Sequence, residues 1–255
     1  MSVARIQMRL LQKLGTQFNW KPLIQIPEVT SLATFLQGDG AQAFLKEFNA
    51  TAKEKYGDVA RNIRVLRYDK DAKIIRGSNP FAVVHADNIL KSQGIRVATM
   101  ADLEKGLIAG FDLERTYEDT DLVLKSRSEP NKYLATNLAD QLDARGTKLG
   151  KNPLVVQLRG LQLVRDANSD YGLSFKLTDE SKATEATQLV EENNGKTLKK
   201  LDENHMIILD AEGYLCTYPR KTGLLRVCLY RYIFSSNEFF AYSDATGRVA
   251  FVRNR

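Results

Sequence analysis

The chain has 255 residues, and its 37 lysines and arginines outnumber its 31 aspartates and glutamates, which gives a formal net charge of +6. Apolar residues make up 43% and charged residues 27%. These fractions match soluble globular proteins and exclude collagen-like, coiled-coil and disordered chains. No apolar run approaches the roughly 18 residues of a transmembrane helix, so the sequence predicts no membrane-spanning segment.

Residues 1–27 carry four bases and no acid. In a helix, Ile6, Leu10 and Leu14 would share one apolar stripe. We expect a surface helix that packs this stripe on the core. A transit peptide or a helix lying on a membrane surface is the alternative.

Two segments of the first half have a clear helical pattern. Residues 41–56 place Phe44, Phe48 and Ala52 on one stripe, and Gly57 follows as a stop signal. Residues 128–145 contain a proline near their start, are followed by a glycine, and repeat leucine every fourth residue. These leucines are Leu134, Leu138 and Leu142.

A third helix is predicted over residues 99–108. Thr99 is suited to the N-cap position, and Asp102 stands three residues later as a carboxylate variant of the capping box. Short strands are predicted between the helices. They cover residues 63–68, 82–85 and 122–125.

The second half has mainly strand patterns. Residues 154–164 alternate in two phases that slip at Gly160, which indicates either a β-bulge or two strands broken at this glycine. Residues 171–177 predict another strand and residues 182–192 a short helix. A meander of hairpins then follows, because apolar runs alternate with loops that end in glycine. These runs are residues 206–209, 214–218, 224–234, 239–242 and 249–252.

Together these patterns predict an α+β fold. We expect a helix-rich region at residues 1–146 and an antiparallel β-rich region with one short helix at residues 153–255. The second region would form a sheet or a small barrel, because its order of elements resembles that of an OB-fold.

The two cysteines, Cys216 and Cys228, are too few for a secreted disulfide scaffold. We therefore expect reduced thiols and a cytoplasmic location. A turn near residues 221–223 would place the two side chains opposite each other on neighbouring strands, as small apolar groups in the core.

The sequence carries no strong catalytic or metal-binding motif. Glycine-rich phosphate loops and zinc-binding pairs are missing, so we predict no cofactor, no metal ion and no catalytic residue. The histidines His85 and His205 are expected to be structural. Residues 112–121 hold five acids, for which we expect a solvated face; a Mg²⁺ or Ca²⁺ loop is the alternative. These acids are Asp112, Glu114, Glu118, Asp119 and Asp121.

Positive charge is concentrated in two stretches. Residues 61–76 hold six bases, one at every third position, and two acids. A hairpin turning at residues 69–71 would bring these bases together. Residues 213–255 hold seven bases, two acids and nine aromatic residues. Arg226, Tyr230 and Tyr232 would share the solvent face of a strand whose other face is aliphatic.

Aromatic rings beside guanidinium groups can stack on bases and neutralise phosphates. The alternative is that these rings fill a β-rich core. The candidate nucleic-acid-binding residues are Arg61, Arg64, Arg67, Arg220, Lys221, Arg226, Tyr230, Arg231, Tyr232 and Arg253.

The sequence thus predicts a non-catalytic binding protein with RNA or DNA as its ligand. One alternative is a structural or assembly protein, in which the basic stretch meets the acidic residues 101–121 of a neighbouring subunit in a homo- or hetero-oligomer. A second alternative is a metal-dependent nuclease-like enzyme, because Asp170, Glu180 and Lys182 follow the acid, acid, lysine order of such sites.

Overall fold

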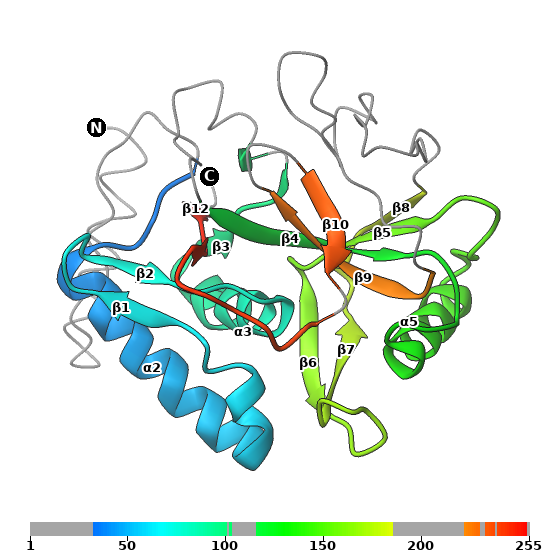
Figure 1. Cartoon of the computed structure of the whole chain (residues 1–255), viewed down its shortest axis with the longest axis horizontal. Helices are drawn as coiled ribbons and strands as arrows, with labels where there is room; N and C mark the ends of the chain where they lie inside the picture. Colours follow the sequence, from blue (N-terminus) through cyan, green and yellow to red (C-terminus); the bar gives the residue numbers. More distant parts are fainter. Residues whose placement is uncertain are drawn as a thin grey trace.

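The computed structural model describes residues 33–100, 102–103, 116–185, 222–229, 233–237 and 239–253 (Figure 1). It confirms the α+β class, with helices leading and most strands in the second half of the chain. The helices are α2 (Gly38–Tyr56), η1 (Gly57–Asn62), α3 (Pro80–Leu90), η2 (Lys91–Gln93) and α5 (Lys132–Ala144). The strands are β1 (Arg67–Asp69), β2 (Ile74–Arg76), β3 (Ile95–Val97), β4 (Tyr117–Leu124), β5 (Leu154–Gln157), β6 (Leu161–Arg165), β7 (Leu173–Leu177), β8 (Ala183–Glu185), β9 (Leu224–Leu229), β10 (Ile233–Asn237), β11 (Gly247–Arg248) and β12 (Phe251–Arg253).

The main sheet has the strand order β10-β9-β4-β5-β8, and β11 pairs in parallel with the beginning of β4. Strand β4 is central and pairs antiparallel with β5 on one side and β9 on the other. The sheet therefore joins a strand of the first region to strands of the second. The small barrel is not formed, because the described strands leave β10 and β8 as separate edges.

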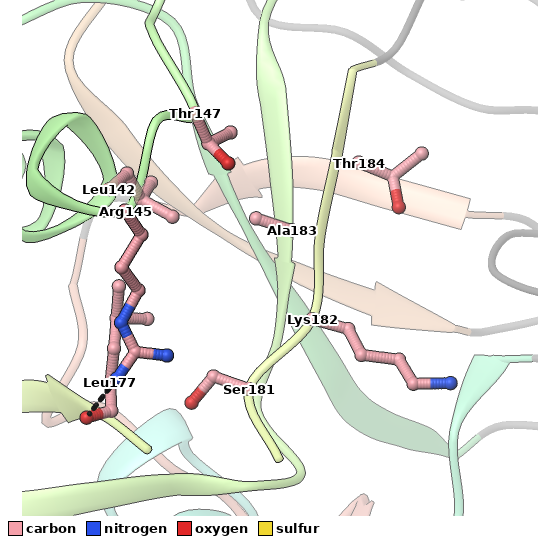
Figure 2. A pocket seen from close by; sticks show the side chains of 8 residues that line it. All are labelled: Leu142, Arg145, Thr147, Leu177, Ser181, Lys182, Ala183 and Thr184. Atoms are coloured by element: carbon pink, nitrogen blue, oxygen red, sulfur yellow. Dashed lines mark hydrogen bonds between the residues drawn. The ribbon is translucent and has the colours of Figure 1, made fainter. Parts of the chain in front are cut away.

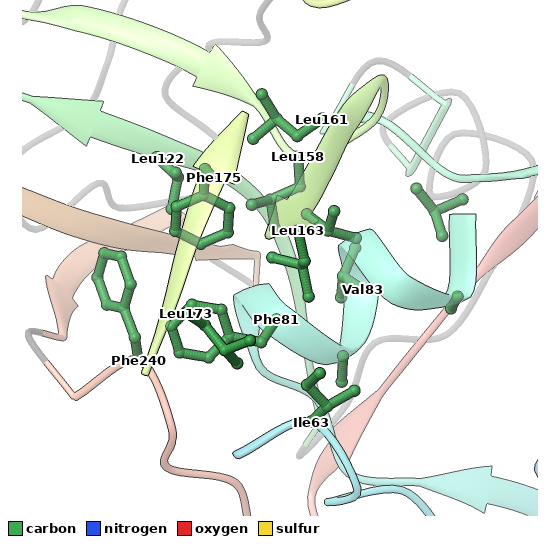
Figure 3. Close-up of a cluster of buried hydrophobic side chains, with 14 of the residues drawn as sticks. Ile63, Phe81, Val83, Leu122, Leu158, Leu161, Leu163, Leu173, Phe175 and Phe240 are labelled. Atoms are coloured by element: carbon green, nitrogen blue, oxygen red, sulfur yellow. The ribbon is translucent and has the colours of Figure 1, made fainter. Parts of the chain in front are cut away.

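Three two-stranded sheets, β1–β2, β3–β12 and β6–β7, surround the main sheet. Helix α3 lies below β4, while α2 runs beside the β1–β2 hairpin (Figure 1). Ten of the eleven residues of α3 are buried, so this helix forms the centre of the core. Figure 3 shows its Phe81 against β6 and β7, where Phe81 stacks on Phe175 with ring centroids 5.2 Å apart and Phe240 meets both rings.

The position of α3 overturns one prediction, the strand at residues 82–85. Asn79 caps this helix by accepting a hydrogen bond from the backbone N–H of Ala82 at 2.7 Å, and Pro80 takes the first helical position. Because the helix is covered on nearly every side, its sequence lacks the polar face that gives a 3.6-residue period.

The amphipathic helices are confirmed. In α2, Phe44, Phe48 and Ala52 are buried, and the helix ends at Gly57 with a φ of +58°. Helix α5 buries the three predicted leucines, although it begins at Lys132 and not at residue 128. The capping box forms as expected: the Thr99 N–H donates to Asp102 Oδ2 at 2.9 Å. Residues 100, 102 and 103 are helical, whereas residues 101 and 104–108 of that predicted helix lie outside the described residues.

The strand predictions are only partly correct. Of residues 63–68, only the last two join a strand, whereas residues 122–125 lie mostly in β4 and residues 173–177 form β7. Residues 154–164 form two strands in different sheets, broken at Gly160, whose φ is +80°. This confirms the second of the two interpretations.

Other assignments in the second half are wrong. The predicted helix at 182–192 opens with strand β8 because its backbone pairs with β5. The single strand at 224–234 is two antiparallel strands, β9 and β10. Residues 240–241 form a turn instead of a strand. Residues 1–27, 206–209 and 214–218 lie outside the described part of the chain. Within the described part, no helix has both the length and the apolar character needed to cross a bilayer.

Candidate nucleic-acid interface

The basic stretch at 61–76 contains the predicted hairpin. Strands β1 and β2 pair antiparallel, with Arg67 opposite Arg76 and Asp69 opposite Ile74. Asp69 closes the turn: its Oδ1 accepts backbone N–H bonds from Asp71 and Ala72, both at 3.0 Å. The N–H of Ala72 and then the Arg76 guanidinium lower the pKa of Asp69. Asp69 therefore stays ionised and holds the turn from which the neighbouring bases project.

Except for the half-buried Arg76, the bases on this hairpin are exposed, and further exposed bases lie on α2. Arg64 Nε donates to Asn49 Oδ1 of α2 at 3.1 Å. Lys46 and Lys53 lie three residues before and four residues after Asn49, so they share its helix face. We call this set the basic region. Its members, all exposed, are Lys46, Lys53, Arg61, Arg64, Arg67, Lys70 and Lys73.

Residues 46–76 hold nine lysines and arginines against five acids, so the segments that carry the basic region have a net charge of +4. Among the described residues, the ion pair recorded within the 61–76 stretch joins Arg76 to Asp69, with Nε and Oδ2 3.1 Å apart. The two lysines on α2 were missed at the sequence level. Their i, i+7 spacing places them on one face of the helix, but their position beside Arg64 depends on the packing of α2 against the hairpin.

The prediction for Arg226 is wrong. Its side chain is fully buried, with Nε and Nη2 each 2.6 Å from one oxygen of Asp119. Burial alone would lower the pKa of Arg226, but Asp119 outweighs burial and raises it. Alternation along a strand indicates a solvent-exposed face only where no other element covers that face. Both faces of β9 are covered, as Leu225 and Val227 are also buried.

Arg226 instead fixes a turn near the C-terminus. Its Nη1 donates to the carbonyl oxygens of Phe239 at 3.3 Å and Tyr242 at 2.8 Å, and its Nη2 donates to that of Ser78 at 3.2 Å. The guanidinium also lies over the Tyr117 ring, 5.6 Å from its centroid. Arg226 is thus a positioning residue and not a surface contact.

The described structure does not bring the other candidate nucleic-acid-binding residues together. Arg253 is exposed at the end of β12, opposite Ile95 of β3. The remaining five lie outside the described residues. They are Arg220, Lys221, Tyr230, Arg231 and Tyr232. Cys216 also lies outside, while Cys228 is a free, buried thiol.

The described part of the acidic stretch, residues 116–121, is not a solvated face. Glu118, Asp119 and Asp121 are buried on β4. Glu118 pairs with Arg248, whose Nε lies 3.1 Å from Oε1. Neither carboxylate oxygen of the buried Asp121 has a hydrogen-bond partner among the described residues. Burial raises the pKa of Glu118 to about 8 and that of Asp121 to about 7. Asp112 and Glu114 lie outside the described residues.

The described residues contain no group of three His, Cys, Asp or Glu side chains placed to hold a metal ion. Asp170, Glu180 and Lys182 are exposed, and Glu180 forms an ion pair with Lys91 at 2.5 Å. His85 is buried, and its Nε2 lies 3.2 Å from the Phe48 carbonyl oxygen. Burial lowers the pKa of His85 to about 4, so the ring is neutral near pH 7.

A hollow of about 410 Å³ lies between the end of α5 and β8, and Figure 2 shows the side chains that line it. The Arg145 guanidinium in this hollow donates hydrogen bonds to the carbonyl oxygens of Thr178 at 2.6 Å and Leu177 at 3.1 Å. Lys182 points away from Arg145 in the figure. The two cations do not converge, so the hollow lacks the focused charge of an anion site.

Comparison with family models, curated proteins and solved structures gives no match for this chain.

Proposed function

We propose that this protein is a non-catalytic nucleic-acid-binding protein and that its basic region contacts the phosphate backbone. The observation that carries the proposal is the exposure of Arg61, Arg64 and Arg67 together with that of the two lysines of α2, where Arg64 donates to Asn49 between those lysines. Long cationic side chains held on a helix and a hairpin neutralise phosphates and release bound counterions, which drives association.

The binding surface differs from the one expected at the C-terminus. Arg226 is committed to Asp119, so the phosphate contacts are assigned to the first half of the chain. Phosphate contacts position a protein on nucleic acid without specifying sequence. We therefore expect affinity for both RNA and DNA, with little dependence on base sequence.

The test is a fluorescence anisotropy titration with labelled duplex and single-stranded oligonucleotides of about 20 nucleotides, from about 50 to about 200 mM salt. Binding should weaken steeply over this range. The variant Arg61→Gln/Arg64→Gln/Arg67→Gln should bind more weakly, and its log K against log salt slope on duplex should fall by about 2 to 3.

A matched control removes the same charge elsewhere. Lys132, Lys148 and Lys151 are exposed on α5 and the loop after it, and Lys132→Gln/Lys148→Gln/Lys151→Gln should leave the slope nearly unchanged. No binding by the unmodified protein at about 50 mM salt rejects the function. Equal losses in the two triple variants reject the assignment to the basic region.

A further inference from the structure

Two aromatic rings stand out from the surface at one turn near the C-terminus. Of the large apolar side chains in the described residues, Phe239 is 64% exposed and Tyr242 is 52% exposed, and no others reach this class. Both belong to residues 239–246, which we call the aromatic turn. The backbone closes this turn through the Tyr242 N–H, which donates to the Phe239 carbonyl oxygen at 3.2 Å.

The aromatic turn is fixed from beneath. Arg226 donates to the carbonyl oxygens of Phe239 and Tyr242, and Phe240 is fully buried against Phe81 and Phe175. Rings on such a support lose little backbone freedom when a ligand binds, which lowers the entropic cost of association.

Backbone contacts join the aromatic turn to the segments that carry the basic region. The Ser78 N–H donates to Ser243 Oγ at 2.9 Å, and the Gly77 N–H donates to the Gly247 carbonyl oxygen at 2.6 Å. These two residues directly follow Arg76, the last residue of β2, whose half-buried side chain pairs with Asp69. On another side, the Tyr171 hydroxyl accepts the Phe240 N–H, and Asn62, next to Arg61, donates to the Tyr171 carbonyl.

We propose that Phe239 and Tyr242 form a base-stacking site for single-stranded nucleic acid beside the basic region. The inference rests on the proposed function and deepens it. Exposed rings stack on unpaired bases, while neighbouring cations hold the backbone. A duplex keeps its bases stacked internally and cannot use the rings in this way.

The chemistry favours a nucleic acid over a protein partner at this turn. A stable protein interface buries about 800 Å² on each side around an apolar centre. Two rings, with no other exposed large apolar side chain in the described residues, do not make such a centre. Two exposed rings on a turn held in place by Arg226 instead suit stacking on unpaired bases.

The experiment compares the unmodified protein with Phe239→Leu/Tyr242→Leu, which keeps apolar bulk but removes both rings. Fluorescence anisotropy is measured with a single strand of about 12 nucleotides and with a duplex of the same length. The leucine variant should bind the single strand about 10- to 100-fold more weakly and the duplex equally well. The variant Phe239→Tyr/Tyr242→Phe keeps the rings and should keep the affinity.

A single strand containing 2-aminopurine reports stacking directly, and its fluorescence should be quenched by the unmodified protein but not by the leucine variant. Because both rings are exposed, thermal melting should be the same for all variants. If the unmodified protein binds neither nucleic acid, the proposed function fails and the stacking site with it. If it binds both with a steep salt dependence and the leucine variant behaves identically, only the stacking site is rejected. Loss of duplex binding in the leucine variant also overturns the proposal.

Discussion

The Arg226 guanidinium donates a hydrogen bond to each carboxylate oxygen of Asp119 at 2.6 Å, and neither side chain is exposed to solvent. The Ser78 hydroxyl donates to the same carboxylate at 2.6 Å. One ion pair thereby links β4, β9, the residues before α3 and the aromatic turn. Such a pair is costly to break because a lone charge would remain buried.

Asp119→Ala should therefore lower the free energy of unfolding by about 3–5 kcal/mol. Arg226→Met should cost a similar amount, and the double variant should cost less than the sum of the two, because no lone charge remains. The double variant should still be less stable than the unmodified protein, since the carbonyl groups of Phe239 and Tyr242 lose their donor.

Urea denaturation measures these values. The exposed pair between Lys91 and Glu180 provides the control, because its side chains are 56% and 50% exposed. Glu180→Gln should cost less than about 1 kcal/mol. Equal costs for Glu180→Gln and Asp119→Ala would show that burial adds nothing to the central pair.

Asp121 should make the protein less stable as the pH rises. Its ordinary pKa of 3.8 is raised to about 7 in the folded state by burial. Between these values the folded state holds a proton that the unfolded chain has released. The unfolding free energy therefore falls with increasing pH, by up to about 1.4 kcal/mol per unit, from about pH 4 to about pH 7.

Asp121→Asn removes this titration. The difference in unfolding free energy between the variant and the unmodified protein should be smallest near pH 4 and should shift in favour of the variant up to about pH 7. Taking the difference cancels the contributions of Glu118 and His85, which are present in both proteins. Parallel stability curves over this interval would contradict the buried, ionisable state of Asp121.

The sequence predicts helices well where one face of the helix is exposed to solvent. Helices α2 and α5 each have an apolar stripe and a polar opposite face, so the spacing of their apolar residues is sufficient to predict them. Helix α3 is buried almost throughout, and its only local signal was Asn79 followed by Pro80. That pair is a helix-start signal, whereas Val83 and Val84 after it favour a strand.

In the candidate site, too, the sequence predicts local features but not those that depend on distant residues. The hairpin at 67–76 follows from a local turn at Asp69, so its exposed bases could be expected. The burial of Arg226 depends on Asp119, which is 107 positions away in the sequence. Alternation along β9 cannot reveal which strands and turns cover it. The sequence alone therefore does not predict that Arg226 is buried, because its pairing with Asp119 depends on the register of β4 and β9.

Cys228 should be unreactive in the folded protein. Its thiol is buried, donates to Asp119 Oδ1 at 3.2 Å, and has a pKa raised well above the ordinary value by burial. Thiolates are the reactive species. In a Cys216→Ser background, a chromogenic disulfide reagent should label Cys228 only after denaturant is added. Rapid labelling without denaturant would contradict its burial.

Gly77 should be irreplaceable where the basic hairpin meets the aromatic turn. Its φ is +95°, and a Cβ atom would lie 2.6 Å from the Val65 carbonyl oxygen and 3.1 Å from Ser243 Oγ. The backbone of Val65 cannot yield easily, so Gly77→Ala should lower the unfolding free energy by about 2–4 kcal/mol. Gly94 supplies the control, because its φ is +68° but a Cβ atom there would meet nothing within 4 Å. Gly94→Ala should cost only about 1–2 kcal/mol, the penalty of a left-handed conformation. The difference between the two variants in urea denaturation isolates the crowding at the hairpin, and equal costs would mean that Gly77 is needed for its φ alone.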